Sequence, residues 1–257
     1  MAITVQDLAN MIDHSLLHPT MTDDDIKEGC LLAMKYNAAS VCLKPYAIFM
    51  AKDILKDSDV MVGSVIGFPH GNNTVAIKVA ETKQACEDGA VEIDMVVNIG
   101  KVKGGDFDFV AKEIKSINEA TLAGGAILKV IFENDYLDEN EISKLCAICS
   151  EIDVAFVKTS SGYGFVKQEN GMYSYEGATA PHLKLMRKET KDSIEVKAAG
   201  GVRTLPDLLY VRSIGVTRIG ATATAKILDD ATDVLASGKT LEEMTPTGIG
   251  IGSGGGY

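Results

Sequence analysis

Two lysines close apolar runs in this 257-residue chain, Lys158 in "VAFVKTSSG" and Lys197 in "IEVKAAGGVRT". A lysine is seldom fully buried unless it is paired or has a chemical task. If the two are neighbours, their ammonium groups repel, and one of them loses its proton more easily than free lysine does. A neutral amine in a pocket attacks carbonyl groups to form a Schiff base. The pair therefore indicates carbonyl chemistry; the alternative is an internal ion network in which both lysines pair with Asp94 and Asp13.

Glycine-rich turns accompany these lysines and could hold an anion. "AAGGVRT", with Gly200 and Gly201, and "RIGATAT", with Gly220 and Thr222, offer backbone amides close to predicted helix starts, which is a favourable setting for phosphate. Thr159 to Gly162 could add donors from the preceding turn. Each glycine pair alone would also suit a tight turn. Together, at consecutive strand ends, they favour phosphate binding.

The elements that must position these residues are eight short apolar runs separated by longer amphipathic segments. Nearly continuous apolar runs are typical of parallel strands that are covered on both faces. The alternation favours a closed (β/α)₈ barrel over an open doubly wound sheet, whose glycine-rich turn is missing after the first strand. We expect one barrel domain over residues 1–244 and a flexible glycine-rich tail over residues 245–257. The runs centre on "MIDHSLL", "SVCL", "MVGSVIGF", "VEIDMVVN", "AILKVIF", "VAFVK", "IEVKAA" and "TRIGAT".

In a barrel of this kind, the carboxyl ends of the strands and the loops after them form the active face. Charged residues buried there without partners would be costly, so they pair or change their protonation. The polar residues at these predicted strand ends are Asp13, Cys42, Asp94, Asn98, Lys129, Lys158 and Lys197.

Composition narrows the possible partners and compartment. The 36 Asp and Glu residues outnumber the 25 Lys and Arg residues, which argues against nucleic acid or an anionic membrane as a partner. Five cysteines without a disulfide spacing indicate a reducing compartment. The pair in "CAIC" falls within a predicted helix and lacks the second half of a zinc motif. With no secretion signal and no apolar run of about 20 residues, we expect a soluble, cytoplasmic protein.

Several segments together resemble the deoxyribose-phosphate aldolase family. They are "IGFPHG", "EIDMVVNIG", "LKVIFE", "FVKTSSG", "VKAAGGVRT" and "RIGAT", and the resemblance runs in order from Ile12 to Thr222. It implies a class I aldolase, without metal or cofactor, that reversibly cleaves 2-deoxyribose 5-phosphate to glyceraldehyde 3-phosphate and acetaldehyde. We also expect a homo-oligomer.

By motif position, the resemblance makes Lys158 the Schiff-base lysine and Lys197 the cation that lowers its pKa. Asp94 would take part in proton transfer through a bound water. The chain ends in Tyr257, as family members often do, and this tyrosine could relay a proton at the enamine carbon; a tail without function is the alternative. Positions that match the family's pocket are Asp13, Cys42 and Lys129, and those that match its phosphate site are Gly162, Gly200, Gly201, Gly220 and Thr222.

Two places depart from the family pattern and bear on substrate preference. Lys44 in "CLKPY" stands where a neutral residue is expected, so an extra charge is expected near the mouth. The segment "YGFVKQENGMYSYEG" is longer than usual, and its Asn170-Gly171 pair predicts a β-hairpin. We predict that this hairpin overhangs the active face; a surface insertion without function is the alternative. Arg203, Arg212 and Arg218 are interpreted as surface or interface charges, although Arg203 is close enough to the glycine pair to assist a phosphate.

Two other functions remain open from the sequence. One is a class I aldolase for a different phosphorylated sugar, which cleavage assays with several sugar phosphates would separate. The other is a non-catalytic barrel that binds a sugar phosphate or a protein, which would not be trapped on Lys158 by acetaldehyde and borohydride.

Overall fold

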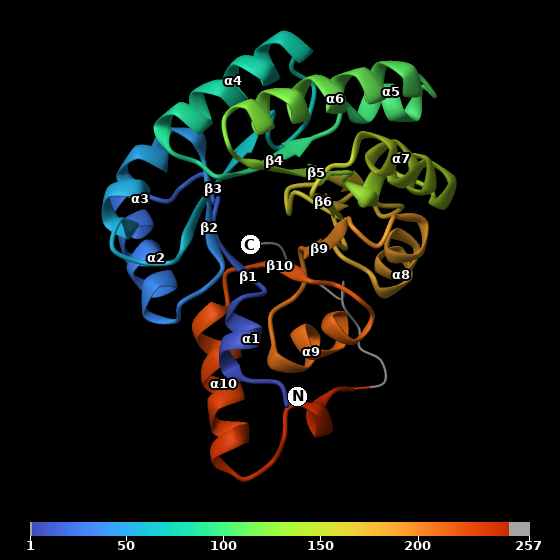
Figure 1. Ribbon diagram of the computed structural model, residues 1–257. Helices are drawn as coiled ribbons and strands as arrows, with labels where there is room; N and C mark the ends of the chain where they lie inside the picture. The colour runs from blue at the N-terminus through green and yellow to red at the C-terminus, as the bar shows by residue number, and fades with distance from the viewer. Residues whose placement is uncertain (1, 247–257) are drawn as a thin grey trace.

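The structure is a computed structural model that describes residues 2–246. Within this range, eight parallel strands close into a barrel in the order β1-β10-β9-β6-β5-β4-β3-β2 (Figure 1). The predicted (β/α)₈ barrel and its eight strands are therefore confirmed. The strands are β1 Ile12–Leu16, β2 Ser40–Leu43, β3 Met61–Ile66, β4 Glu92–Val96, β5 Ile127–Ile131, β6 Phe156–Lys158, β9 Glu195–Ala199 and β10 Arg218–Ala221.

Helices surround the barrel on its outside (Figure 1). The longer ones are α2 Asp23–Lys35, α3 Ile48–Leu55, α4 Val75–Asp88, α6 Phe107–Ala123, α7 Glu139–Ile152, α8 Ala180–Glu189, α9 Leu205–Ser213 and α10 Thr224–Ala236. The shorter ones are α1 Val5–Ala9, α5 Ile99–Lys103 and the 3₁₀ turns η1 Pro45–Ala47, η2 Asn134–Tyr136 and η3 Glu242–Met244.

Local sequence signals define where several helices begin. Thr22 caps α2 in a capping box: its side chain accepts a hydrogen bond from the Asp25 N–H, and the Asp25 carboxylate accepts one from the Thr22 N–H. Thr204 and Asp207 form the same arrangement at α9. These caps satisfy backbone N–H groups that have no partner inside the helix. The loops after β1 and β9 therefore enter their helices in a fixed geometry.

The connection after β6, the sixth of the barrel, contains an insertion. It forms a two-stranded antiparallel hairpin, β7 Val166–Lys167 and β8 Tyr173–Ser174, with Val166 opposite Ser174. The Asn170-Gly171 signal thus predicted the hairpin correctly, with Gly171 at a left-handed φ of 80° that suits glycine.

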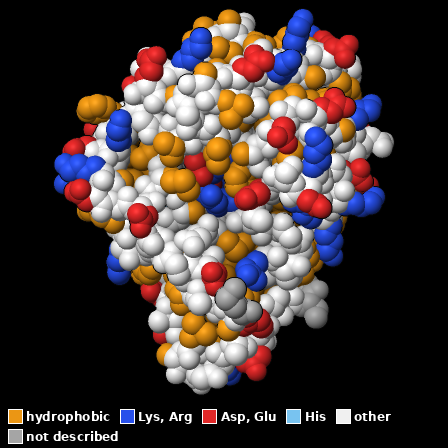
Figure 2. Space-filling model, in the orientation of Figure 1, with side chains coloured by type: hydrophobic (Ala, Val, Ile, Leu, Met, Phe, Trp, Pro, Cys, Tyr) orange, Lys and Arg blue, Asp and Glu red, His pale blue; other side chains and the backbone are white. Residues whose placement is uncertain are grey.

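Most of the core is apolar, but the interior of the barrel is not. The strands bury Ile12, Val41, Ile93 and Leu128 against the surrounding helices. Barrel interiors are usually filled by branched apolar side chains. Here, by contrast, Lys129 and Lys197 are among the largest fully buried side chains. Figure 2 shows acidic and basic side chains in a central hollow that hydrophobic side chains surround.

Two other sequence expectations concern the cysteines and the tail. Cys146 and Cys149 are both buried in α7, and all five cysteines are free thiols. Among residues 2–246, no helix combines the length and the apolar character needed to cross a bilayer. The tail expected from residue 245 lies outside the described residues except for its first two positions, and Tyr257 lies outside them as well.

A buried ion pair outside the barrel holds two helices to the end of β4. The Lys78 Nζ of α4 is 2.8 Å from the Glu113 Oε1 of α6, and both side chains are fully buried. Lys78 also donates to the Val96 carbonyl at 2.7 Å, and the Asn98 N–H donates to Glu113 Oε2 at 2.8 Å. Burial lowers the pKa of Lys78, and the Glu113 carboxylate opposes that effect.

We expect Lys78→Met to lower the free energy of unfolding by roughly 3–5 kcal/mol, because it leaves the Glu113 carboxylate buried without its cation. The measurement is urea denaturation followed by circular dichroism. Adding Glu113→Gln should restore part of the loss, since a glutamine carbonyl can still accept from Asn98. Lys115→Met, at an exposed position of α6, is the control. An effect of Lys78→Met no larger than that of the control would contradict the assignment.

Candidate active site

Lys158 and Lys197, the two lysines that end apolar runs, are neighbours in the barrel. Lys158 of β6 pairs in register with Lys197 of β9. Both Nζ atoms lie 2.7 Å from the same oxygen, Oδ2 of Asp94 on β4. The two nitrogens are therefore no farther apart than about twice that distance. The prediction that Lys158 and Lys197 are neighbours is confirmed.

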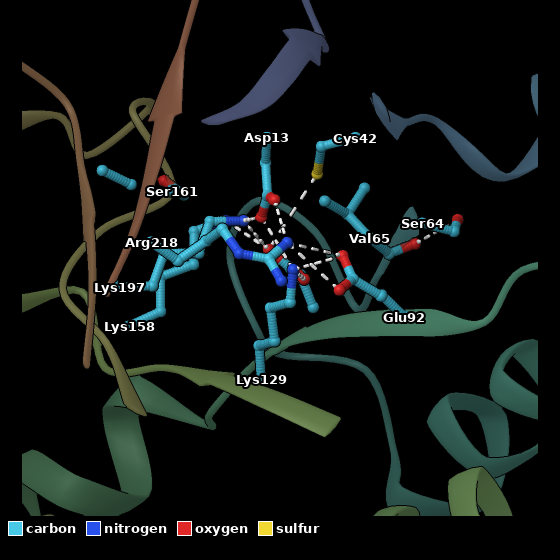
Figure 3. A network of polar contacts seen from close by, with 12 residues as sticks. Asp13, Cys42, Ser64, Val65, Glu92, Lys129, Lys158, Ser161, Lys197 and Arg218 are labelled. Atoms are coloured by element: carbon cyan, nitrogen blue, oxygen red, sulfur yellow. Dashed lines mark hydrogen bonds and ion pairs between the residues drawn. The ribbon is translucent and has the colours of Figure 1, made fainter. Parts of the chain in front are cut away.

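A wider network of charges surrounds this pair (Figure 3). Asp13 of β1 accepts from Lys129 at 2.7 Å and from the Arg218 Nη1 at 2.5 Å, and it also contacts the Lys197 ammonium. Glu92 of β4 lies 2.5 Å from Lys129 and 3.2 Å from Arg218. Charged groups this deeply buried require such partners. The internal ion network that the sequence left open as an alternative is therefore also present, and it surrounds the lysine pair.

Counting formal charges shows that one base of this network is in excess. Among the described residues of this network there are three carboxylates and four basic groups. If every base were protonated, one positive charge would be uncompensated. The carboxylates are Asp13, Glu92 and Asp94, and the bases are Lys129, Lys158, Lys197 and Arg218.

The direction of each pKa shift identifies Lys158 as the base in excess. Burial lowers the pKa of Lys158; the Asp94 carboxylate opposes this, and the Lys197 ammonium lowers it further. Burial would also lower the pKa of Lys197, but the carboxylates of Asp13 and Asp94 raise it well above its usual value. Lys197 therefore keeps its proton, whereas Lys158 is the amine that can become neutral. Burial is a larger cause at Lys158 than the neighbouring cation on which the sequence argument relied.

Asp94 is held ionised between the lysines. Burial would raise the pKa of its carboxyl group, but the ammonium groups of Lys158, Lys197 and Lys129 lower it well below its usual value. An ionised carboxylate accepts protons and hydrogen bonds but is not a proton donor. Beside it, the Cys42 Sγ is 3.9 Å from Asp94 Oδ2. Burial raises the pKa of Cys42 to about 11, so this thiol stays neutral and is no nucleophile.

The glycine turns after β9 and β10 do come together, around a cavity of about 100 Å³. Gly200, Gly201, Gly220 and Thr222 all line it. Gly200 and Gly201 have left-handed φ values of 80° and 93°, which only glycine adopts readily. A Cβ on Gly220 would lie 3.6 Å from the Lys197 Cε. The cavity therefore begins directly beside the lysine pair.

Two residues that the sequence grouped with this cavity have other positions. The Thr159 hydroxyl accepts from the Ala199 N–H at 3.0 Å and lies 3.2 Å from the Ala199 carbonyl, so it joins the ends of β6 and β9. Gly162 has a left-handed φ of 87° but is not among the lining residues of the cavity. Both residues belong to the turn that follows Lys158.

Sequence reasoning missed part of the network. The prediction that Arg218 is a surface or interface charge was wrong: it is 9% exposed and pairs with Asp13 and Glu92. Glu92 had a usable signal, because it precedes Asp94 by two residues on one strand and side chains two apart point to the same face. No comparable local signal was available for Arg218, which could point either way from the first position of β10.

A second missed residue is Glu133, which follows β5 in a left-handed conformation with φ of 60°. It is 1% exposed. Its carboxylate accepts a hydrogen bond from the Ser161 N–H at 3.1 Å and contacts the Ser161 hydroxyl. Burial raises the pKa of Glu133 to about 7, while the bonds from Ser161 oppose that shift. Glu133 thus fixes the turn that runs from Lys158 to Gly162.

The two departures from the family pattern lie at the carboxyl end of the barrel. Lys44 follows β2 and donates to the His18 carbonyl at 2.9 Å, so its charge is tied to the loop after β1. The hairpin insertion ends at Tyr175, which lines the same cavity as Gly200 and Gly220. The base of the insertion therefore lies at the active face, as predicted, whereas the covering of that face by the hairpin itself stays a prediction.

Comparison with known proteins identifies the family of this chain. The deoxyribose-phosphate aldolase of Rhodopirellula baltica is 46% identical over 242 residues, which cover 94% of this chain and 95% of the relative. The corresponding enzyme of Caldanaerobacter subterraneus subsp. tengcongensis is 42% identical over 228 residues, covering 88% and 94%. The tetrameric deoxyribose phosphate aldolase of Aeropyrum pernix superposes with a TM-score of 0.79 at 27% identity and covers 90% of this chain and 93% of its own. The model of the DeoC/LacD family aldolases matches residues 8–223. The chain therefore belongs to the DeoC/LacD family of aldolases, which makes it a carbon–carbon lyase.

Proposed function

We propose that this aldolase reversibly cleaves 2-deoxyribose 5-phosphate into glyceraldehyde 3-phosphate and acetaldehyde, through a Schiff base on Lys158. The observation that carries the proposal is the shared Asp94 oxygen, 2.7 Å from both Lys158 and Lys197, with a small glycine-lined cavity beside Lys197. The names of the relatives support the choice of sugar. The proposed steps use side chains and water, without metal or cofactor.

The first step is attack by the neutral Lys158 amine on the C1 aldehyde of the open-chain sugar. A bond forms between Nζ and C1, and one amine proton moves to the former carbonyl oxygen. A second proton, taken from solvent water, allows that oxygen to leave as water and gives a positively charged iminium. The Asp94 carboxylate, 2.7 Å from the nitrogen in the free enzyme, lies where it stabilises this charge. Lys197 keeps its proton and supplies the cation that favours a neutral amine at the start.

The iminium then acts as an electron sink for carbon–carbon cleavage. A base removes the proton of the C3 hydroxyl, the C2–C3 bond breaks, and its electron pair moves toward the nitrogen. Glyceraldehyde 3-phosphate leaves, and the two-carbon fragment remains as a neutral enamine. We assign the base to Asp94 acting through a water, because the carboxylate lies 2.7 Å from Lys158 and the surrounding lysines keep it ionised and able to accept a proton.

The last step returns a proton to C2 of the enamine. This regenerates an iminium, which water hydrolyses to acetaldehyde and the free Lys158 amine. We assign Tyr257 to the relay that delivers this proton; it lies outside the described residues. A phenol is a suitable relay, since it can both donate and accept a hydrogen bond.

The phosphate is assigned to the cavity lined by Gly200, Gly201, Gly220 and Thr222. Backbone N–H groups next to glycines can approach an anion closely because no side chain intervenes. On this assignment, the phosphorylated end of the sugar lies beside Lys197 and the aldehyde lies at Lys158. Asp13, Lys129 and Cys42 are buried next to the lysine pair and Asp94, and Thr159 and Gly162 belong to the turn after Lys158.

Two statements about the cellular form also belong to this proposal. We propose that the chain self-associates, supported by the tetramer of the Aeropyrum pernix relative. We propose a cytoplasmic location, supported by five free thiols, which persist in a reducing compartment. The acid excess of the chain gives no reason to expect nucleic acid or an anionic membrane as a partner.

Incubation with acetaldehyde and borohydride should convert Lys158 to N-ethyl-lysine, because the reductant fixes the Schiff base. Mass spectrometry of proteolytic peptides locates the label. Lys158→Arg should remain unlabelled and inactive, because a guanidinium stays protonated and forms no Schiff base. A specific label on another lysine, or none at all, would reject Lys158 as the Schiff-base residue, and the absence of any label would favour a non-catalytic binder.

Lys197→Met should move the acidic limb of the kcat/KM profile to higher pH by one pH unit or more. Without the Lys197 cation, the protonated form of Lys158 becomes the counter-ion of Asp94, so the pKa of Lys158 rises and less neutral amine exists at pH 7. One pH unit corresponds to about a tenfold loss at pH 7, with recovery in alkaline buffer. Lys112→Met, at an exposed position, is the control. An equal loss at every pH would exclude this electrostatic role.

Tyr257→Phe should slow the exchange of acetaldehyde C2 protons with deuterated water by about 100-fold or more, which is the usual contribution of one acid–base group. Nuclear magnetic resonance follows the exchange directly. Borohydride trapping on Lys158 should be unaffected, since Schiff-base formation precedes the relay. Exchange at the wild-type rate would remove Tyr257 from the mechanism.

A further inference from the structure

The return arm of the hairpin insertion is fastened to the active face. The Glu176 and Gly177 N–H groups donate to the Asp135 carboxylate at 2.5 and 3.2 Å, and the Ala178 N–H donates to the Gly200 carbonyl at 3.0 Å. Gly177 has a left-handed φ of 77°, and a Cβ there would lie 2.8 Å from the Gly200 oxygen. These contacts fix the backbone on the C-terminal side of Tyr175.

The arm that leaves β6 is fastened as well. The Phe165 N–H donates to the Tyr136 hydroxyl at 2.8 Å. Between the two anchors, the hairpin tip is solvated, with Met172 and Tyr173 67% and 57% exposed. The insertion is thus held at its base, where Tyr175 lies, and not at its tip.

Tyr175 itself forms one wall of the cavity assigned to the phosphate. It lines that cavity together with Gly200 and Gly201, which follow β9, and with Gly220 of β10. Its Cε2 atom, next to the ring carbon that carries the hydroxyl, would be 3.4 Å from a Cβ added to Gly200. The polar end of the phenol is therefore close to the turn whose amides would hold the anion. Any side chain at Gly200 would come into contact with this ring.

We propose that Tyr175 determines substrate specificity at the phosphate subsite: it closes the side of the cavity over Gly200 and hydrogen-bonds a bound phosphate. This inference rests on the proposed function. The cavity, at about 100 Å³, is well below the roughly 300–1,000 Å³ of a pocket for a whole ligand. It suits one compact end group. A rigid wall here favours sugars that carry a phosphate over sugars with a larger end group. The hydroxyl favours phosphorylated sugars over unphosphorylated ones.

The test compares cleavage of 2-deoxyribose 5-phosphate with cleavage of unphosphorylated 2-deoxyribose. Tyr175→Phe should raise KM for the phosphorylated sugar about fivefold, the usual effect of one hydrogen bond, and leave kcat unchanged. Tyr175→Ala should reduce the preference for the phosphorylated sugar, measured as the ratio of kcat/KM values, by tenfold or more. Neither variant should change kcat/KM for 2-deoxyribose by more than twofold.

Tyr173→Ala is the matched control, because Tyr173 belongs to the same hairpin but is exposed. It should leave the preference unchanged. An unchanged preference in Tyr175→Ala would overturn the proposal. Equal losses with both sugars in Tyr175→Ala would also overturn it, since they would mean that the ring only supports the fold of the insertion.

A separate measurement distinguishes failure of this inference from failure of the proposed function. Titration of the protein with inorganic phosphate requires no catalysis. Tyr175→Phe should weaken phosphate binding about fivefold, and Tyr173→Phe should not. If the wild type fails to cleave 2-deoxyribose 5-phosphate but this difference remains, only the assigned reaction is wrong. If the wild type cleaves the sugar and both variants bind phosphate equally, only the role of Tyr175 is wrong.

Discussion

The shared oxygen of Asp94 is the interaction on which the site depends. Two lysine nitrogens lie 2.7 Å from it, yet their environments push their proton affinities in opposite directions. Lys197 has Asp13 as a second carboxylate, whereas Lys158 has only a share of Asp94. Because each carboxylate can compensate one cation, the less well paired lysine carries the proton that is easiest to remove. A difference in partners, and not in residue type, separates the nucleophile from the cation.

The barrel makes this asymmetry possible by replacing its usual apolar filling with charges from strands far apart in the sequence. Arg218 on β10 reaches Glu92 on β4, which lies on the opposite side of the ring. Asp13 and Lys129 complete the layer. Removing one of the three carboxylates would add a second uncompensated positive charge to this buried layer, which costs several kcal/mol. The network therefore both holds the strands in place and sets the protonation of Lys158.

The sequence predicted the barrel and the lysine pair because both have local signals. Apolar runs mark the strands, and a lysine at the end of such a run is conspicuous. The neighbouring positions of Lys158 and Lys197 then follow from the strand order. Arg218 could not be placed this way, because its burial depends on a partner across the ring and on which face of β10 points inward. Glu133 depends on a left-handed backbone that its own residue type does not favour. Tyr175 was quoted within an insertion, but its contact with Gly200 is a matter of tertiary packing.

The surplus of one base over the carboxylates has a consequence for turnover. A protonated Lys158 and an iminium on Lys158 carry the same charge at nearly the same point. A pocket that disfavours the ammonium form therefore also disfavours the covalent adduct, and Asp94 offsets this cost only in part. The covalent adduct is therefore not excessively stable. Formation of the neutral enamine and hydrolysis of the iminium both remove the excess positive charge. A fourth carboxylate beside Lys158 would hold substrate longer but turn it over more slowly.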